Sequence, residues 1–133
     1  MDKKEQIRRG VIEMILLGIT KNVDLVIIDN LESKLINKLY HHRKSQIVKD
    51  NFNIYLSGKH PDSEDINNTL DLMIQDKIIG PKLMGTQEII IKKYYSRKEE
   101  DLKNLRKKMT SKEYDFLIRI GEKIEVKERY RKI

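Results

Sequence analysis

Cysteine is absent from all 133 residues of the sequence. Its absence excludes a disulfide framework, a cysteine nucleophile, an iron–sulfur cluster and a thiolate zinc site. Long apolar runs are also lacking. The run that follows the basic N-terminus covers only residues 14–19, because Glu13 precedes it, so it is too short for a membrane span or a secretory signal. We therefore expect a cytoplasmic protein.

Glycine and proline are scarce, at six and two residues, so the sequence contains neither a phosphate-cradling glycine-rich loop nor a long flexible linker. We expect a single domain over residues 1–133. The three histidines do not have metal-ligand spacing, since His41 and His42 are adjacent and His60 lies in a turn. No nucleophile–base pair is recognisable. We therefore predict no metal, no cofactor and no enzymatic activity.

The excess of positive over negative charge is confined to the C-terminal part of the chain. The formal net charge is +7, with a pI of about 9.5. Residues 1–80 carry 12 Lys and Arg against 12 Asp and Glu, whereas residues 81–133 carry 16 against 9. A one-sided basic half is typical of proteins that bind a polyanion, most commonly nucleic acid. The alternative is an ordinary solvated, lysine-rich surface.

Apolar residues at three- and four-residue spacing predict helices over most of the chain. Asp62 or Ser63 is expected to cap the fourth helix, whose buried face would be Ile66, Leu70 and Met73. A capping box at Thr110 or Ser111 with Glu113 is expected to begin the last helix. The predicted helices are residues 3–20, 31–44, a short helix after Ser45, 64–79, 97–109 and 111–127.

Strand character is strongest near residues 82–95, where a β-branched run follows a turn-like segment at 85–87. This pattern predicts a β-hairpin. Residues 25–28 are either a strand or the start of a helix, because periodicity does not separate the two. Residues 57–61 read as a turn, with Tyr55 and Leu56 packed inward before it. The tail from Lys127 to Ile133 is expected to fray.

The order helix, helix, tight turn, helix and Lys/Tyr-rich hairpin resembles a winged helix-turn-helix. Residues 66–79 place Ile66, Leu70, Met73 and Ile78-Ile79 at a spacing similar to that of PadR-like regulators. Residues 91–96 resemble the second wing strand of that family, and residues 9–17 resemble its first helix. Lys77 stands where the family usually has glycine. The resemblance implies a mainly α fold with a small β-hairpin, a winged-helix core over 24–96 and a basic helical extension over 97–133.

The resemblance also implies function: a small dimeric transcriptional regulator or repressor that binds double-stranded DNA as a homodimer. Centromere or origin binding for a plasmid or phage is an alternative. Asn67, Asn68 and Thr69 would contact bases. The phosphate backbone would be contacted by basic residues in the second helix, the wing and the start of the extension, namely Arg43, Lys44, Lys82, Lys92, Lys93, Arg97 and Lys98.

The fourth helix is acidic, which points to a different class of function. It carries Asp62, Glu64, Asp65, Asp71 and Asp76, and phosphate repulsion would oppose its insertion into the major groove. The competing interpretation is a winged-helix-like module that binds protein instead of DNA. The surface distinguishes them: DNA binding favours a continuous basic stripe, and protein binding favours a stripe broken by these carboxylates.

Overall fold

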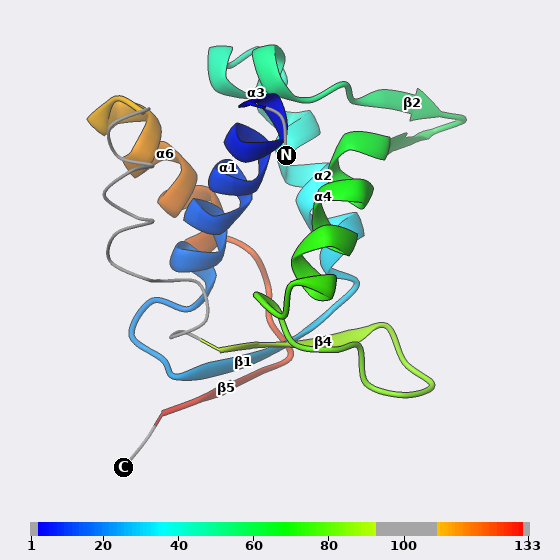
Figure 1. Ribbon diagram of the computed structural model, residues 1–133, viewed down its shortest axis with the longest axis vertical. Coiled ribbons are helices and arrows are strands. Elements are labelled where there is room, and N and C mark those ends of the chain that lie inside the picture. The colour runs from blue at the N-terminus through cyan, green and yellow to red at the C-terminus, as the bar shows by residue number, and fades with distance from the viewer. Residues whose placement is uncertain (1–2, 93–108, 132–133) are drawn as a thin grey trace.

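Helices stand on one side of a small antiparallel sheet, and a separate hairpin projects from the opposite end (Figure 1). The computed structural model describes residues 3–92 and 109–131. The mainly α fold with a small antiparallel sheet is confirmed. The elements are α1 (Lys3–Ile19), β1 (Leu25–Asp29), α2 (Leu31–His41), α3 (Gln46–Asn51), β2 (Tyr55–Ser57), β3 (His60–Asp62), α4 (Glu64–Gln75), β4 (Glu88–Lys92), α6 (Ser111–Glu122) and β5 (Glu128–Tyr130).

Strand β1 forms the centre of the three-stranded sheet, in the order β4-β1-β5, and both pairings are antiparallel. The ambiguous segment at residues 25–28 is thus a strand. Val26 and Ile28 are fully buried, while the alternate residues Leu25 and Ile27 are only partly covered. This alternation is what a strand shows when one of its faces packs against helices.

The expected hairpin at residues 82–95 is present in reduced form. Its second strand, β4, is confirmed as far as Lys92, and Gly85 makes the turn with a φ of 76°. The first arm pairs only through an isolated bridge between Lys82 and Ile89. Strand β4 makes its long pairing with β1 instead, opposite Leu25–Asp29. Residues 93–95 lie outside the described residues.

The inward packing expected of Tyr55 and Leu56 is wrong. Both are exposed, on strand β2 of a hairpin that β3 completes. Gly58, with a φ of 65°, and Lys59 form its two-residue turn, because glycine adopts this left-handed conformation without steric cost. The hairpin projects away from the body of the protein (Figure 1).

The frayed tail is also wrong, because residues 128–130 form β5 at the free edge of β1. Leu25 lies opposite Tyr130, and the backbone N–H of Asp24 donates to the Tyr130 carbonyl at 2.8 Å. Helix α6 ends at Glu122 instead of Lys127, and the chain then turns into this strand. Residues 109–131 therefore contact the rest of the fold, α6 at α1 and β5 at β1.

Helix α4 begins as expected, since the Ser63 hydroxyl accepts from the Ile66 N–H at 3.3 Å. Its predicted face of Ile66, Leu70 and Met73 is buried. The helix ends at Gln75, earlier than the predicted end at residue 79. Lys77 takes a left-handed φ of 60°, and the N–H of Ile78 donates to the Met73 carbonyl at 2.9 Å. That bond is typical of a Schellman motif, in which glycine is the usual residue at the position of Lys77.

Helices α1 and α6 cross where each has a glycine. A Cβ at Gly18 would lie 2.0 Å from the Ile118 carbonyl oxygen, and one at Gly121 would lie 1.9 Å from that of Ile15. The predicted capping box at the start of α6 is confirmed at Thr110, with both of its hydrogen bonds to Glu113. The predicted helix over residues 97–109 falls, up to residue 108, outside the described residues.

Candidate nucleic-acid interface

Two of the predicted backbone-contacting residues, Arg43 and Lys44, lie in the turn between α2 and α3. Both are exposed. The Arg43 guanidinium is held in place by Tyr40, near the end of α2. Its Nη1 donates to the Tyr40 carbonyl at 3.0 Å, and its central carbon lies 4.3 Å from the centre of the Tyr40 ring. A cation–π contact of this kind restricts the side chain but leaves its remaining donors available.

A hollow of about 360 Å³ lies at the same junction, and both residues line it. Lys49 of α3 adds a third cation, and Phe52 is among its apolar walls. Among the described residues, this lining contains no Asp or Glu. Three cations in a lining without a carboxylate attract an anion, and the carboxylate of Asp65 accepts from the backbone N–H of Asn53, one of the lining residues. Lys49 was missed from the sequence, because the pattern does not show which side of the short helix after Ser45 faces Arg43 and Lys44.

The basic residues predicted for the wing are less available for contact with the DNA backbone. Lys82 forms an ion pair with Glu32, with 3.6 Å between Nζ and Oε1. Lys92 is partly covered at the end of β4, opposite Leu25. The other three predicted residues, Lys93, Arg97 and Lys98, lie outside the described residues. The described part of the wing therefore adds one ion-paired cation and one partly covered cation.

The three predicted base-contacting residues point in different directions on α4. Thr69 is buried, and its hydroxyl donates to the Asp65 carbonyl at 2.7 Å, so it does not face solvent. The Asn67 amide donates to Asp62 at 3.3 Å, and its buried Oδ1 has no hydrogen-bond partner within the part of the chain that the structure describes. Of the three, only Asn68 is exposed.

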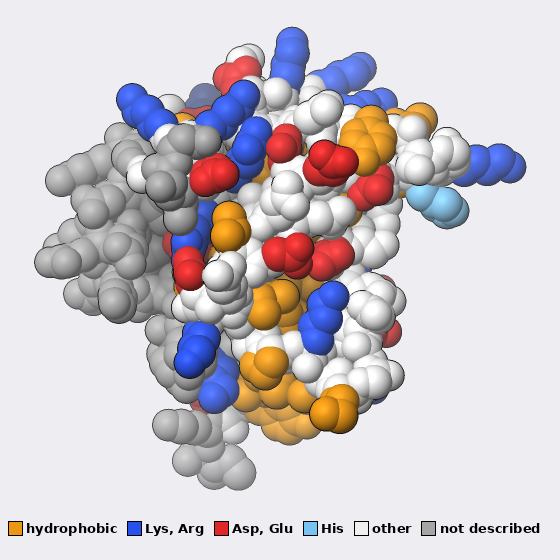
Figure 2. Space-filling model, turned by 45° about the vertical axis from the view of Figure 1, so that its right-hand side comes forward, with side chains coloured by type: hydrophobic (Ala, Val, Ile, Leu, Met, Phe, Trp, Pro, Cys, Tyr) orange, Lys and Arg blue, Asp and Glu red, His pale blue; other side chains and the backbone are white. Residues whose placement is uncertain are grey.

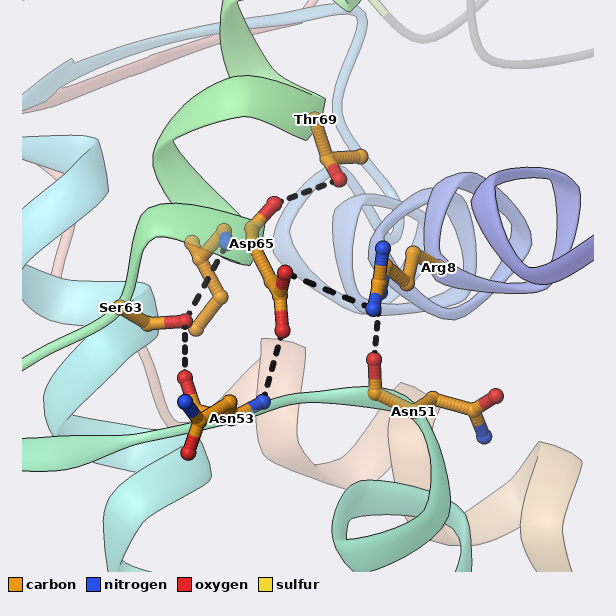
Figure 3. Close-up of polar contacts among 7 residues, drawn as sticks. Arg8, Asn51, Asn53, Ser63, Asp65 and Thr69 are labelled. Carbon is orange, nitrogen blue, oxygen red and sulfur yellow. Dashed lines mark hydrogen bonds and ion pairs between the residues drawn. The ribbon is translucent and has the colours of Figure 1, made fainter. Parts of the chain in front are cut away.

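Two carboxylates of the acidic segment, Asp65 and Asp76, form ion pairs with α1, and Figure 3 shows the contacts of Asp65. Asp65 lies 3.4 Å from Arg8 of α1 and accepts from the Asn53 N–H at 2.8 Å, while the Arg8 Nε donates to the Asn51 carbonyl at 2.5 Å. Asp76 pairs with Arg9 at 2.8 Å. These contacts join α1 to α4 and to the end of α3, and they neutralise part of the acidic charge that the sequence shows.

The outward face of α4 remains acidic. It consists of exposed residues at helical spacing, with two carboxylates among them: Glu64, Asn68, Asp71, Leu72 and Gln75. Acidic side chains lie across the middle of the face shown in Figure 2, and Lys and Arg side chains gather toward its margins. On this side of the molecule the basic surface is therefore interrupted at α4.

Other kinds of site find little support in the described residues. They contain no group of three His, Cys, Asp or Glu side chains that would hold a metal ion. In the same residues, no helix has both the length and the apolar character needed to cross a bilayer.

His41 and His42 contact each other edge to face, with 4.9 Å between ring centres. Burial lowers the pKa of His42, and the nearby His41, Lys123 and Lys38 lower it further. These rings therefore lie in a positively charged environment, which does not favour a cation.

Similarity to known proteins gives no indication of function for this chain. Comparisons with protein-family models, with curated proteins and with solved structures found no match for this chain.

Proposed function

We propose that the protein binds double-stranded DNA through the junction of α2 and α3, as a small winged-helix-like regulator. The observation that carries this proposal is the group of Arg43, Lys44 and Lys49 around a hollow whose described lining contains no carboxylate. Cations presented in this way neutralise backbone phosphates and release counterions, which is the main source of affinity in protein–DNA binding.

The order of elements supports a winged-helix-like arrangement. After α1, strand β1 precedes α2 and α3, and α4 leads through the short arm at Lys82 into β4, which pairs with β1. In helix-turn-helix proteins the helix before the recognition helix crosses the phosphate backbone. Here α3 and the β2–β3 hairpin lie between α2 and α4 in the chain. Arg43, Lys44 and Lys49 are concentrated at the junction of α2 and α3.

The composition of α4 favours binding with limited base discrimination. Asn68 is exposed and its amide is able to pair with adenine, but Glu64 and Asp71 flank it on the same face. Phosphate contacts position a protein on DNA without reading its sequence. The affinity therefore comes chiefly from the α2–α3 junction, and Asn68 supplies a modest sequence preference. Binding of this kind suits a repressor, and it also suits a centromere- or origin-binding protein.

The test compares single charge-removing variants with a matched control. Lys44→Gln and Lys49→Gln each remove one cation from the junction, and Arg129→Gln removes one exposed cation from β5 at the far end of the fold. Fluorescence anisotropy with a labelled duplex should show weaker binding for the first two variants. Each should lower the salt slope by about 0.9, the value for one phosphate contact. If Arg129→Gln weakens binding as much as they do, the junction is not the binding surface.

The proposal includes a homodimer, because two half-sites on DNA require two DNA-binding units. Sedimentation at micromolar concentration measures this directly. A species of about twice 15.9 kDa supports the two-half-site arrangement, and a species of 15.9 kDa contradicts it.

A second candidate function, protein binding, is favoured by the exposed face of α4. Leu72 is exposed beside Asp71 there, and the projecting hairpin exposes Tyr55 and Leu56. Charge reversal on this face separates the candidates. Asp71→Lys should strengthen duplex binding if α4 lies near DNA, since it replaces repulsion of phosphate by attraction. Tight binding of a protein partner that Asp71→Lys abolishes, together with no binding of duplex, favours the second candidate.

A further inference from the structure

A second group of cations lies beside the α2–α3 junction, between α2 and the end of α6. It surrounds a hollow of about 540 Å³, which we call the α2–α6 groove. The groove shares no lining residue with the hollow at the junction, but the two are adjacent in the chain. His41 and His42 line the groove, and the next two residues, Arg43 and Lys44, line the hollow. Arg43 also folds back onto Tyr40 of α2, so cations follow one another from the junction to the groove.

Positive charge outweighs negative charge in the groove. Lys34, Lys38 and Lys123 line it, and Glu125 is the one carboxylate in its described lining. Lys34 donates to the backbone carbonyl of Glu125 at 3.2 Å instead of pairing with its carboxylate. Within the described residues, Lys38 and Lys123 form no ion pair. These two ammonium groups are therefore available to an anion.

The ring of His42 lies in the positive field of this groove. Burial is the main cause that lowers its pKa, and the charges of His41 and Lys38 on α2 and of Lys123 after α6 lower it further. The charges that shift this pKa are thus all cationic, although Glu125 also lines the groove. An anion held beside these cations would favour protonation of the ring.

The groove presents charge to a ligand, and its apolar residues are closed off. Ile120 and Ile124 are only 3% and 2% exposed, so Lys, His and Asn side chains form most of the surface that a ligand meets. Spaced cations on an open surface suit an anion whose charges are also spaced. A DNA strand carries one phosphate for about every 3.4 Å of axis. Helix α2 rises by about 10 Å from Lys34 to His41, a length that accommodates about three phosphates.

We propose that the α2–α6 groove is a second contact for the same DNA duplex, where Lys38 and Lys123 neutralise phosphates of its backbone. The exposed amide of Asn37 lies in the same lining and supplies a further donor to phosphate or sugar. This inference rests on the DNA binding proposed above, and it extends the contact surface from the junction along α2 to the end of α6. The two added contacts steepen the expected salt slope from about −2.7 to about −4.5.

Salt-dependent anisotropy with the labelled duplex tests the groove separately from the junction. Lys38→Gln and Lys123→Gln should each weaken binding by about eightfold at about 0.1 M salt and reduce the steepness of the slope by about 0.9. Lys38→Arg keeps the charge and should keep the slope. Arg129→Gln, the matched loss of one exposed cation on β5, should change neither quantity.

The outcomes separate a failure of the groove from a failure of the proposed function. If Lys44→Gln and Lys49→Gln reduce the slope while Lys38→Gln and Lys123→Gln do not, the groove is not a contact and the junction remains the binding surface. If the unaltered protein does not bind duplex even at low salt, both proposals are overturned.

NMR titration of the unaltered protein is a second measurement that does not depend on the folding of any variant. The pKa of the His42 ring should rise when the duplex is bound, because phosphate at the groove offsets the nearby cations. His60, beside the turn of the β2–β3 hairpin, is the control and should shift less. An unshifted His42 pKa, or an equal rise at both histidines, would overturn the inference, because the duplex would then have no specific contact at the groove.

Discussion

Alanine in place of Gly121 tests the closest contact in the fold. The new Cβ would lie 1.9 Å from the Ile15 carbonyl oxygen and 2.9 Å from the Gly18 Cα. Both are backbone atoms of α1, so no side chain is able to rotate away. An ordinary contact begins at about 3.4 Å, and the two helices would therefore have to separate by roughly 1.5 Å at this point.

Separating the two helices would lower the free energy of unfolding, because packing contacts beside the crossing would be lost. Ile15 of α1 and Leu117 of α6 are fully buried beside the crossing, and both would lose contacts. Overpacking commonly costs about 1–3 kcal/mol, and a backbone clash belongs at the upper end. Helix propensity acts in the opposite direction, since alanine in a helix is favoured over glycine by about 1 kcal/mol. We expect a net loss of at least about 2 kcal/mol in the free energy of unfolding.

Urea denaturation measures this loss. With a typical m-value of about 1–3 kcal/mol/M, the midpoint should fall by about 1 M or more. Gly85→Ala is the control, because a Cβ there meets nothing within 4 Å and only the positive φ of 76° is strained. That strain should cost about 1 kcal/mol. An unchanged or raised midpoint for Gly121→Ala would show that α1 and α6 do not cross this closely.

Three further predictions concern the core, the end of α4 and the pH dependence. Leu70→Ala should lower the free energy of unfolding by about 2–5 kcal/mol in urea, because Leu70 is 1% exposed; a loss below about 0.5 kcal/mol would contradict its burial. Lys77→Gly should raise the free energy of unfolding by about 1 kcal/mol, because glycine adopts the left-handed conformation of residue 77 without strain. A decrease in the free energy of unfolding would refute the assignment of strain to Lys77. Because the pKa of His42 is lowered in the fold, stability should decrease as pH falls below the ordinary value of 6.5, and His42→Gln should remove that part of the pH dependence.

The parts of the fold that the sequence predicts are those set by local interactions. Ser63 lies three residues before Ile66 and Thr110 three before Glu113, and both caps form as their spacing predicts. The face containing Leu70 follows from helical periodicity alone. These features depend on residues within a turn or two of one another, so no tertiary information is needed to find them.

The parts of the fold that the sequence does not predict depend chiefly on residues distant in the chain. Strand β5 has exposed residues throughout and forms only because β1 offers it a free edge about a hundred residues earlier in the chain. The β2–β3 hairpin has no buried face, so no hydrophobic alternation marks it. Within the site, Thr69 was predictable as buried, since it lies three residues after Ile66 on the inward face. Lys49 was missed although it lies only five residues after Lys44, because the sequence does not show on which side of the short α3 it lies.

The most direct test of the central proposal is the salt dependence of binding to a DNA duplex by the unaltered protein. If the cations at the α2–α3 junction contact phosphates, the logarithm of affinity should fall linearly with the logarithm of salt concentration. Three contacts, from Arg43, Lys44 and Lys49, predict a slope of about −2.7 or steeper. The absence of duplex binding at low salt, or binding whose affinity does not change with salt, would contradict the proposal.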